Sequence, residues 1–539
     1  MDSFDYIVVG AGSAGCVLAS RLTADGRFRV LLLEAGGSDR SVWVRMPIGY
    51  GKTFHDPRHN WKFMTDPVPG FGGRDSYWPR GKVLGGSSSI NAMVYVRGQH
   101  ADFDDWAALG NPGWSWAEVG PVFRRMENSA AGADDWRGAG GPLDVADERG
   151  LVHPLCEDWL AACEAAGLAR NPDFNGADQE GVGIYQITTR RGVRASAATA
   201  YLRPAMRRAN LAVATGAQVT RVRFEGRRAV GVDYRRGGVE RSAQARGEVI
   251  LSAGAVMSPV LLHLSGVGDP ARLIRNGVAV VHDLDQVGRN LQDHVGIDYL
   301  YRARVPTLNQ LLRPWSGRLR VGARYLLRRD GPLALSVNQG GGFFRTRPEV
   351  RPNMQLYFSP VSYLRAAPGR RQLMTPDPYP GMLLGLSNCR PASRGWLAIR
   401  SPDPLEPPAI QPNYLDSPED VAELLEGVRF LRRIAAAPPM ARIVEQELAP
   451  GEGIAGEEAL VADIRARAGT LFHVSGTCAM GPDPASAVVD ARLRVHGLEG
   501  VRVIDASIFP RVTSGNTNAP SIMVGERGSD LVLEDARGA

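Results

Sequence analysis

The 539-residue sequence contains few lysines and cysteines. Its three lysines, Lys52, Lys62 and Lys82, lie near the N-terminus, whereas arginines are spread along the whole chain. No run of five or six basic residues occurs, so the net charge of +6 gives no reason to expect a nucleic-acid partner. The five cysteines are odd in number and include no CxxC pair, which argues against a disulfide framework and favours a reducing cytoplasm.

The sequence also lacks a segment typical of secretion or membrane insertion. It begins MDSFDYIVVG, with acidic residues where a signal peptide would carry basic ones. The most apolar later run, VILSAGAVMSPVLLHLSGVG from Val249, is interrupted by serines, glycines, a proline and a histidine. We therefore expect a buried strand followed by a helix there, and no transmembrane segment. A cytoplasmic location is expected, with peripheral membrane contact left open.

Metal-binding patterns are missing as well. There is no HxH, no HExxH and no cluster of Cys and His, so we expect no metal site. His263 falls in an apolar helix and is expected in the core, while surface or packing positions are expected for His55, His59, His294 and His496. Ser87 and Ser514 have no nucleophile-elbow context, which makes a serine hydrolase a poor interpretation.

The chain is long enough for at least two domains, because single cores stop growing at roughly 250–300 residues. The first 36 residues predict a βαβ unit, with strands at 5–10 and 28–33 around a helix at 13–24. Antiparallel strands are expected over 211–234, with a turn at 225–227. SPEDVAELLEGVRFLRRIA predicts an amphipathic helix with Ser417 as N-cap. Its expected apolar face consists of Val421, Leu424, Leu425, Val428, Leu431 and Ile434.

The sequence GAGSAG, which fits GxGxxG, lies between the first strand of this unit and its helix. Gly10 allows the tight turn, Gly12 lets the backbone approach a pyrophosphate, and Gly15 lets helix and strand pack closely. Glu34 at the end of the second strand can accept hydrogen bonds from an adenosine ribose and would repel a 2′-phosphate. The pattern predicts an adenine dinucleotide and disfavours NADP among the candidates.

A second glycine-rich stretch, RGKVLGGSSSINAMVYVRG from Arg80, lies where a simple NAD dehydrogenase would continue with further βα units. Gly85, Gly86, Ser87 and Ser88 can present N–H groups and hydroxyls to the same pyrophosphate, and Asn91 can reach the ring system beyond it. Two such loops indicate an extended, deeply held cofactor.

At this point the sequence resembles the glucose–methanol–choline (GMC) oxidoreductases, a flavoprotein family. The resemblance rests on GAGSAG with Glu34, GKVLGGSSSINAMVYVRG, GAVMSPVLLHLSGVG, HVSGTCAMG from His473 and VIDASIFPRVTSGNTNAPSIMVGER from Val503, in the family's order and over nearly the whole chain. Among subgroups the sequence is most similar to bacterial choline and alcohol dehydrogenases.

The resemblance implies an α/β (α+β) fold: a discontinuous Rossmann-like FAD-binding domain, and a substrate-binding domain whose antiparallel sheet covers the flavin. We expect the FAD-binding domain over 1–155, 205–300 and 470–539, and the substrate-binding domain over 156–204 and 301–469. The oligomeric state is not predicted.

The resemblance makes His473 the active-site base and Asn516 its partner. Oxidation of an alcohol requires removal of the hydroxyl proton and transfer of a hydride from the carbon, which flavin N5 can accept. Histidine can take the proton near neutral pH, and an asparagine N–H can stabilise the developing alkoxide. Cys478 in the same motif is expected to be buried in a helix and not to act as a nucleophile.

The resemblance also assigns a set of residues to FAD. These are Gly10, Gly12, Ser13, Gly15, Glu34, Ala35, Arg80, Gly81, Val83, Gly86, Ser87, Asn91, Ala92, Met93, Val94, Val219, Asp505, Ala506, Asn516 and Thr517. Some choline oxidases attach FAD covalently through a histidine just before the asparagine of the second block. Ile90 occupies that position here, so we expect non-covalent FAD.

The substrate is expected to be an uncharged primary alcohol, bound by Trp61, Gln339, Tyr357 and Phe472. Choline-specific members carry a glutamate in a segment like NQGGGFFR, and Gln339 stands there, which disfavours choline although aromatic rings could still bind its cation. An aromatic lid is expected from the irregular segment 50–80, with Phe54, Trp61, Phe63, Tyr77 and Trp78.

Electrons could pass to a quinone-like acceptor, which we favour, or to O2 with formation of hydrogen peroxide. Three alternatives stay open: an alcohol oxidase, a choline dehydrogenase, and a non-redox lyase that keeps FAD. Anaerobic flavin bleaching by an alcohol would separate the oxidative functions from the lyase. A light-driven decarboxylase is disfavoured because such relatives lack the active-site histidine, and a non-catalytic flavin-binding protein because both His473 and Asn516 are present.

Overall fold

The computed structural model describes residues 3–363 and 375–538. The predicted βαβ unit is confirmed, with β1 (Ser3–Val9), α1 (Ser13–Leu22) and β2 (Val30–Glu34), and the two strands pair in parallel. Every residue of β2 is buried, as expected for a strand covered on both faces. The long C-terminal helix α15 (Asn518–Gly538) packs against α1, so the last part of the chain returns to the first.

The first sheet has seven strands in the order β10-β2-β1-β13-β12-β11, with β24 paired to β13. Its further strands are β10 (Leu211–Thr215), β11 (Ala217–Glu225), β12 (Arg228–Arg236), β13 (Val239–Leu251) and β24 (Val501–Val503). The antiparallel pair β11–β12 and its turn are confirmed. The first part of the predicted range was wrong, since β10 pairs in parallel with β2 at the edge of the sheet and does not form a hairpin with β11.

The second sheet also has seven strands and is antiparallel throughout. Its order is β22-β16-β19-β18-β17-β7, with β23 paired to β16. The strands are β7 (Gly181–Ile184), β16 (Val295–Ala303), β17 (Gly340–Phe344), β18 (Met354–Ser359), β19 (Gly381–Asn388), β22 (Val444–Ala449) and β23 (Gly469–Thr470).

Helix α12 (Pro418–Ala436) packs against β19 of this second sheet. The predicted helix is confirmed, and the Ser417 side chain caps it by accepting from the Glu419 N–H. The buried face includes five of the six predicted residues, Leu424, Leu425, Val428, Leu431 and Ile434; Val421 is half-buried. Helix α8 (Gly254–Leu264) follows β13, as the sequence predicted, and buries His263.

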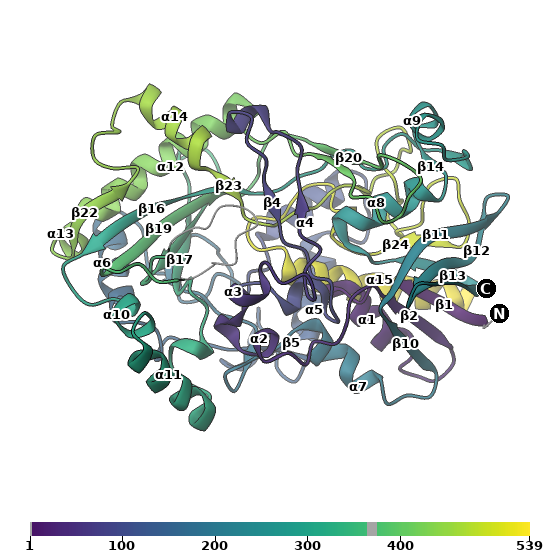
Figure 1. Cartoon of the computed structure of the whole chain (residues 1–539), viewed down its shortest axis with the longest axis horizontal. Helices are drawn as coiled ribbons and strands as arrows, with labels where there is room; N and C mark the ends of the chain where they lie inside the picture. The colour runs from purple at the N-terminus through teal and green to yellow at the C-terminus, as the bar shows by residue number, and fades with distance from the viewer. Residues whose placement is uncertain (1–2, 364–374, 539) are drawn as a thin grey trace.

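Figure 1 shows the two sheets at opposite ends of an elongated molecule, with both termini beside the first sheet. This is the expected α/β arrangement, in which chain segments from the beginning, middle and end build the nucleotide fold. The predicted border at residue 300 falls inside β16, a strand of the second sheet.

The segment 50–80 is more ordered than its composition suggested. It contains α3 (Tyr50–Thr53) and a two-stranded hairpin of β3 (Phe63–Met64) with β4 (Tyr77–Trp78). Phe63 pairs with Trp78 and Met64 with Tyr77 across this hairpin, and Phe63 and Trp78 pack on the core of the second sheet. The sequence missed the hairpin because each strand is only two residues long.

Candidate active site

A cavity of about 560 Å³ lies between the two sheets and takes its walls from both. Of the residues assigned to the cofactor, eighteen line this cavity: Gly10, Gly12, Ser13, Glu34, Ala35, Arg80, Gly81, Gly86, Ser87, Asn91, Ala92, Met93, Val94, Val219, Asp505, Ala506, Asn516 and Thr517. Gly15 and Val83 do not. Gly15 instead supports the tight packing of α1, since a Cβ there would lie 1.9 Å from the Gly10 carbonyl oxygen.

The two glycine loops touch each other at one end of the cavity. The Gly85 N–H donates to the Ala11 carbonyl at 2.7 Å. A Cβ on Gly86, whose φ is +52°, would lie 2.7 Å from the Gly12 Cα, and a Cβ on Gly10, whose φ is +100°, would lie 2.5 Å from the Ser252 carbonyl oxygen. Side chains are excluded at these positions, so the loops present bare backbone to the cavity.

Glu34 joins the end of β2 to the first loop. Its carboxylate accepts from the Ala11 N–H at 2.9 Å and from the Gly36 N–H at 2.7 Å. Burial raises the pKa of Glu34 to about 7, although these two N–H groups pull it down. Each carboxylate oxygen still has a lone pair for a ribose hydroxyl.

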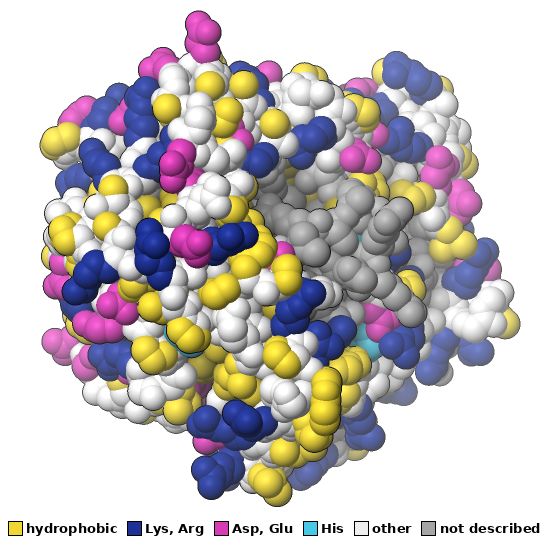
Figure 2. Space-filling model, turned by 60° about the vertical axis from the view of Figure 1, so that its left-hand side comes forward, with side chains coloured by type: hydrophobic (Ala, Val, Ile, Leu, Met, Phe, Trp, Pro, Cys, Tyr) yellow, Lys and Arg dark blue, Asp and Glu magenta, His cyan; other side chains and the backbone are white. Residues whose placement is uncertain are grey.

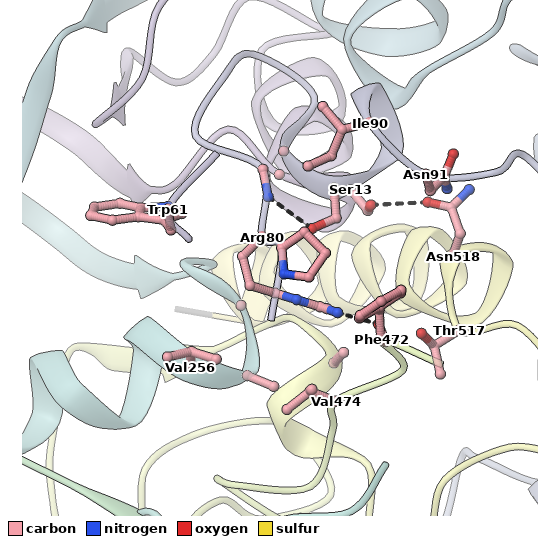
Figure 3. Close-up of a pocket in the computed structure, with 18 of the residues that line it drawn as sticks. Ser13, Trp61, Arg80, Ile90, Asn91, Val256, Phe472, Val474, Thr517 and Asn518 are labelled. Atoms are coloured by element: carbon pink, nitrogen blue, oxygen red, sulfur yellow. Dashed lines mark hydrogen bonds between the residues drawn. The ribbon is translucent and has the colours of Figure 1, made fainter. Parts of the chain in front are cut away.

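Three helices begin at the cavity wall, namely α1, α8 and α15. Helix N-termini carry partial positive charge and free N–H groups, which suits a diphosphate. Ser13 at the start of α1 donates to the Asn518 side chain at the start of α15 at 3.1 Å, a contact visible in Figure 3. Two helix ends are thereby held against one part of the cavity.

His473 lies at the other end of the glycine-lined region, where the second sheet closes over the cavity. The side chain is 8% exposed. Its Nε2 lies 3.1 Å from Asn516 Nδ2, so the structure brings together the two residues that the sequence named as base and partner. Its Nδ1 lies 2.8 Å from Nδ1 of His294, which is fully buried.

The hydrogen-bond network assigns the proton on the His473 ring. His294 Nε2 lies 2.9 Å from the Cys389 carbonyl, which can only accept, so the His294 proton is on Nε2 and its Nδ1 is an acceptor. His473 must then donate from Nδ1, and its Nε2 carries the lone pair.

The opposite side of the network gives the same assignment. Gln355 Nε2 donates to Asn516 Oδ1 at 3.1 Å and to the Tyr185 hydroxyl at 3.0 Å, and that hydroxyl donates to the Leu356 carbonyl. With its oxygen occupied, Asn516 turns its NH2 group toward His473 Nε2. Both sides therefore agree that Nε2 is unprotonated.

The backbone around His473 is fixed by Asp293 and Arg80. Asp293 Oδ1 accepts the His473 N–H at 2.6 Å, and the Arg80 guanidinium donates to the Phe472 carbonyl (Figure 3). Phe472 has a φ of +66°, a left-handed conformation that costs energy in a non-glycine residue. Burial holds the pKa of His473 well below its usual value, and His294 and Arg80 lower it further.

Aromatic side chains cover the cavity beside this pair. Phe54, Trp61, Phe63 and Tyr77 line the cavity together with Phe472 and Tyr357. The Phe54 ring lies 5.5 Å from that of Phe472 and 5.3 Å from that of Tyr77. Trp78 does not belong to this lid, because it is fully buried in the core of the second sheet.

Three further sequence-based assignments need correction. Gln339, named for the substrate, does not line the cavity; its side-chain oxygen accepts the His153 N–H at 2.7 Å, on the side of the sheet where α6 (Leu155–Ala165) begins. Cys478 is buried as expected but lies in a turn, not in a helix. His294, expected at a surface or packing position, contacts the proposed base.

Sequence reasoning missed four residues of this network. They are Asp293, His294, Gln355 and Arg194; Arg194 holds Asn91 through a 2.7 Å bond from Nη1 to its side-chain oxygen. An Asp–His pair at the start of an apolar strand was the only sequence signal for the first two. Nothing in the sequence places Gln355 or Arg194 near the other residues.

A nucleotide fold whose glycine loops face a cavity, with an unprotonated histidine nitrogen at the far end, defines an enzyme that works with a bound dinucleotide. Two models of the GMC oxidoreductase family match the chain, over residues 4–296 and 391–525. The protein belongs to the GMC oxidoreductase family. It is therefore an FAD-dependent oxidoreductase of the class that acts on CH–OH donors.

Curated relatives and solved structures are similar over the whole length. The alcohol dehydrogenase (acceptor) of Pseudomonas putida is 44% identical, with 98% of this chain and 96% of the relative covered. The mitochondrial choline dehydrogenase of Homo sapiens is 43% identical, with 98% and 90% covered. The crystal structure of pyridoxine 4-oxidase from Mesorbium loti superposes with a TM-score of 0.88 at 31% identity, covering 98% of this chain and 99% of that one.

The cavity fits the FAD that family membership implies. Backbone-lined glycine loops and helix N-termini suit the diphosphate, and Glu34 suits the ribose. Four residues that line the cavity each have a buried polar atom without a hydrogen-bond partner among the described residues: Arg80 Nε, Tyr50 Oη, His55 Nδ1 and Tyr357 Oη. Buried polar groups normally find partners, so these atoms point to a polar ligand.

Neither a metal site nor a membrane span is found in the described part of the chain. No group of three or more His, Cys, Asp or Glu there could hold a metal ion. No helix among these residues is both long enough and apolar enough to cross a bilayer.

Proposed function

We propose that the protein oxidises an uncharged primary alcohol to the aldehyde, with His473 as the base, and passes the electrons to a quinone-like acceptor. The observation that carries this proposal is the His473 Nε2 lone pair, which faces the cavity and is fixed from both sides of the ring. In this tautomer Nε2 is the acceptor, and the alcohol hydroxyl would take the place of the Asn516 N–H that Nε2 accepts in this structure.

His473 takes the hydroxyl proton on Nε2 while its Nδ1–H stays bonded to His294. Bound FAD would supply the acceptor for the hydride that leaves the carbon carrying the hydroxyl. Asn516 donates an N–H to the alcohol oxygen as negative charge develops there, and Gln355 holds the amide in that orientation. The aromatic lid and the second sheet leave the His473 side chain 8% exposed, which limits its contact with water.

The lowered pKa of His473 keeps it neutral at working pH, so the base is ready before substrate arrives. The Asp293 carboxylate, which accepts the His473 backbone N–H, positions the ring by fixing the main chain. Asp293, Arg80 and His294 are in this account positioning residues, while His473 and Asn516 contact the substrate.

The aromatic cavity wall near Phe472 supports an uncharged alcohol. Gln339, the counterpart of the glutamate in choline-specific relatives, lies outside the cavity and therefore does not bear on the charge of the substrate. The P. putida relative is named for alcohols, the human relative for choline and the superposed structure for pyridoxine, so an alcohol group is the shared element.

Ile90 lines the cavity and has no nucleophilic atom, which supports non-covalent FAD.

The test is anaerobic mixing of the purified flavoprotein with benzyl alcohol, a short aliphatic alcohol and choline, while the flavin absorbance is followed. Bleaching by the uncharged alcohols is expected, and admission of air then shows whether O2 reoxidises the flavin. Bleaching by choline alone would contradict the substrate assignment. If no alcohol bleaches the flavin although dithionite can reduce it, the lyase is favoured.

Acid precipitation should release the flavin into the supernatant, and yellow pellets would refute non-covalent binding.

A further inference from the structure

Helix α11 (Trp315–Arg328) exposes an unusual set of apolar side chains at the end of the molecule that carries the second sheet. Trp315 is 78% exposed, Leu319 65%, Leu326 69% and Leu327 84%. Leu327 and Trp315 are the two most exposed large apolar side chains among the described residues. Single exposed apolar residues are ordinary, but four on one helix of 14 residues need an explanation.

The helix is firmly attached through its other face. Gly317, Val321 and Tyr325, spaced four residues apart, are buried. The Tyr325 hydroxyl donates to the Gly192 carbonyl at 2.9 Å, and a Cβ on Gly317 would lie 2.0 Å from the Leu311 carbonyl oxygen. The inner face of α11 therefore packs against the rest of the protein. The exposed apolar side chains of the helix contribute nothing to this packing.

The same helix is strongly basic. Residues 313–330 include six arginines and one acidic residue, Asp330, which pairs with Arg324 at 2.6 Å. Arg320 and Arg328 form no ion pair with any other described residue. Figure 2, with this end turned forward, shows hydrophobic and basic side chains mixed along the lower part of the surface.

We propose that α11 docks the protein onto an anionic membrane surface. Exposed tryptophan and leucine beside arginine, on a helix without acidic residues, is the composition of a helix that lies in the bilayer interface. Its leucines and tryptophan can enter the acyl boundary while the arginines reach lipid phosphates. A second copy of the chain would instead bring its own arginines against these, which is unfavourable.

A neighbouring element extends the surface. Helix α2 (Val42–Arg45) lies along the same lower side in Figure 1 and exposes Val42 and Trp43, at 54% and 40%. The chain after α11 runs through a short 3-10 turn to Val337 and Asn338, which line the cavity. Docking of α11 would thus place this part of the cavity wall close to the lipid. This consequence does not depend on which reaction the cavity supports.

The test is co-sedimentation of the holoenzyme with vesicles of phosphatidylcholine and phosphatidylglycerol in equal parts, and with vesicles of phosphatidylcholine alone. We expect binding to the anionic vesicles that high salt weakens. Combined substitution of Trp315, Leu319 and Leu327 by Ser should lower the bound fraction at least tenfold. Arg320→Glu with Arg328→Glu should do the same without removing an apolar group.

The matched control is Ile274→Ser with Leu405→Ser, which removes apolar side chains that are 68% and 50% exposed elsewhere. The control should bind like the unchanged protein, and all variants should keep their melting temperature and flavin content because the altered side chains are exposed. Absence of binding to anionic vesicles at low salt would overturn the proposal. So would binding that survives the α11 substitutions, or an α11 variant whose only change is a lower oligomeric mass.

Discussion

Replacement of His294 offers a sharp test of how the base is held. His294→Asn keeps an oxygen near the position of Nδ1, which can accept the His473 Nδ1–H, but leaves the Cys389 carbonyl without its donor. His294→Gln places its polar group further out, near Nε2, and keeps the donor for that carbonyl instead. His294→Phe keeps neither.

The magnitude follows from the bond that is lost. Leaving a buried donor unpaired costs about 1–3 kcal/mol, and His473 avoids this cost by moving its proton to Nε2, where it can no longer act as a base. The rate of flavin reduction should therefore fall by about 5- to 150-fold in the Phe and Gln variants. The Asn variant should stay within about 5-fold of the unchanged enzyme.

Anaerobic stopped-flow reduction with a saturating alcohol measures this rate directly, and flavin content with melting temperature shows whether each variant is folded. The diagnostic result is that the flavin is reduced faster in the Asn variant than in the Gln variant, and at the same rate in the Gln and Phe variants. If the Gln variant retained activity and the Asn variant lost it, the contact of residue 294 with the Cys389 carbonyl would matter and its contact with His473 would not. Equal rates in all variants would refute a positioning role for His294.

Other predictions concern the base, the glycine loops and the substrate. His473→Ala should lower the rate of flavin reduction by roughly 10²-fold or more at unchanged flavin content, the usual scale for a general base, and reduction at the original rate would disprove the assignment. Because the pKa of His473 is held well below its ordinary 6.5, chiefly by burial, the neutral base persists on acidification; the reduction rate should be level above pH 6.5 and fall only below it. A pH profile that still rises between about pH 7 and pH 8, above the ordinary histidine pKa, would contradict this. Gly86→Ala should yield protein depleted of FAD, since its Cβ would lie 2.7 Å from the Gly12 Cα, and full flavin content by absorbance would show that the loops tolerate a side chain. Gln339→Glu should not create choline oxidation, because this side chain lies outside the cavity; a bleaching rate with choline that rises in this variant would show that the side chain reaches the substrate.

Much of the fold could be predicted because its signals are local. The first βαβ unit combines apolar strands with a glycine-marked turn, and α12 carries both an N-cap and a helical apolar period. The parallel strand β10 was misassigned because strand direction depends on the partner, and its partner β2 lies far away in sequence. The hairpin of β3 with β4 was missed because two-residue strands leave no period to detect.

The residues of the site likewise divide into those that local motifs reveal and those that only the tertiary structure reveals. His473 and Asn516 occur in dense motifs, so the sequence could name them, and the structure places them 3.1 Å apart. His294 could not be found in this way, since its role depends on a 2.8 Å contact between residues 179 positions apart. Gln339 is a residue that the sequence named but the structure places elsewhere. Similarity to a family segment identified its position, but the direction of its side chain depends on packing against α6, which the sequence does not reveal.

The scarcity of lysine has a practical consequence for labelling. Lys52, Lys62 and Lys82 all belong to the lid segment or the loop that follows it, and Lys82 lies 4.4 Å from the centre of the Trp61 ring, which lines the cavity. Lys52 and Lys62 are exposed. Amine-reactive dyes would therefore attach beside the cavity and almost nowhere else, so that a fluorophore there would report ligand binding. For the same reason, immobilisation through amines would tether the enzyme by its lid, and coupling through carboxylates is the better choice for a working electrode or resin.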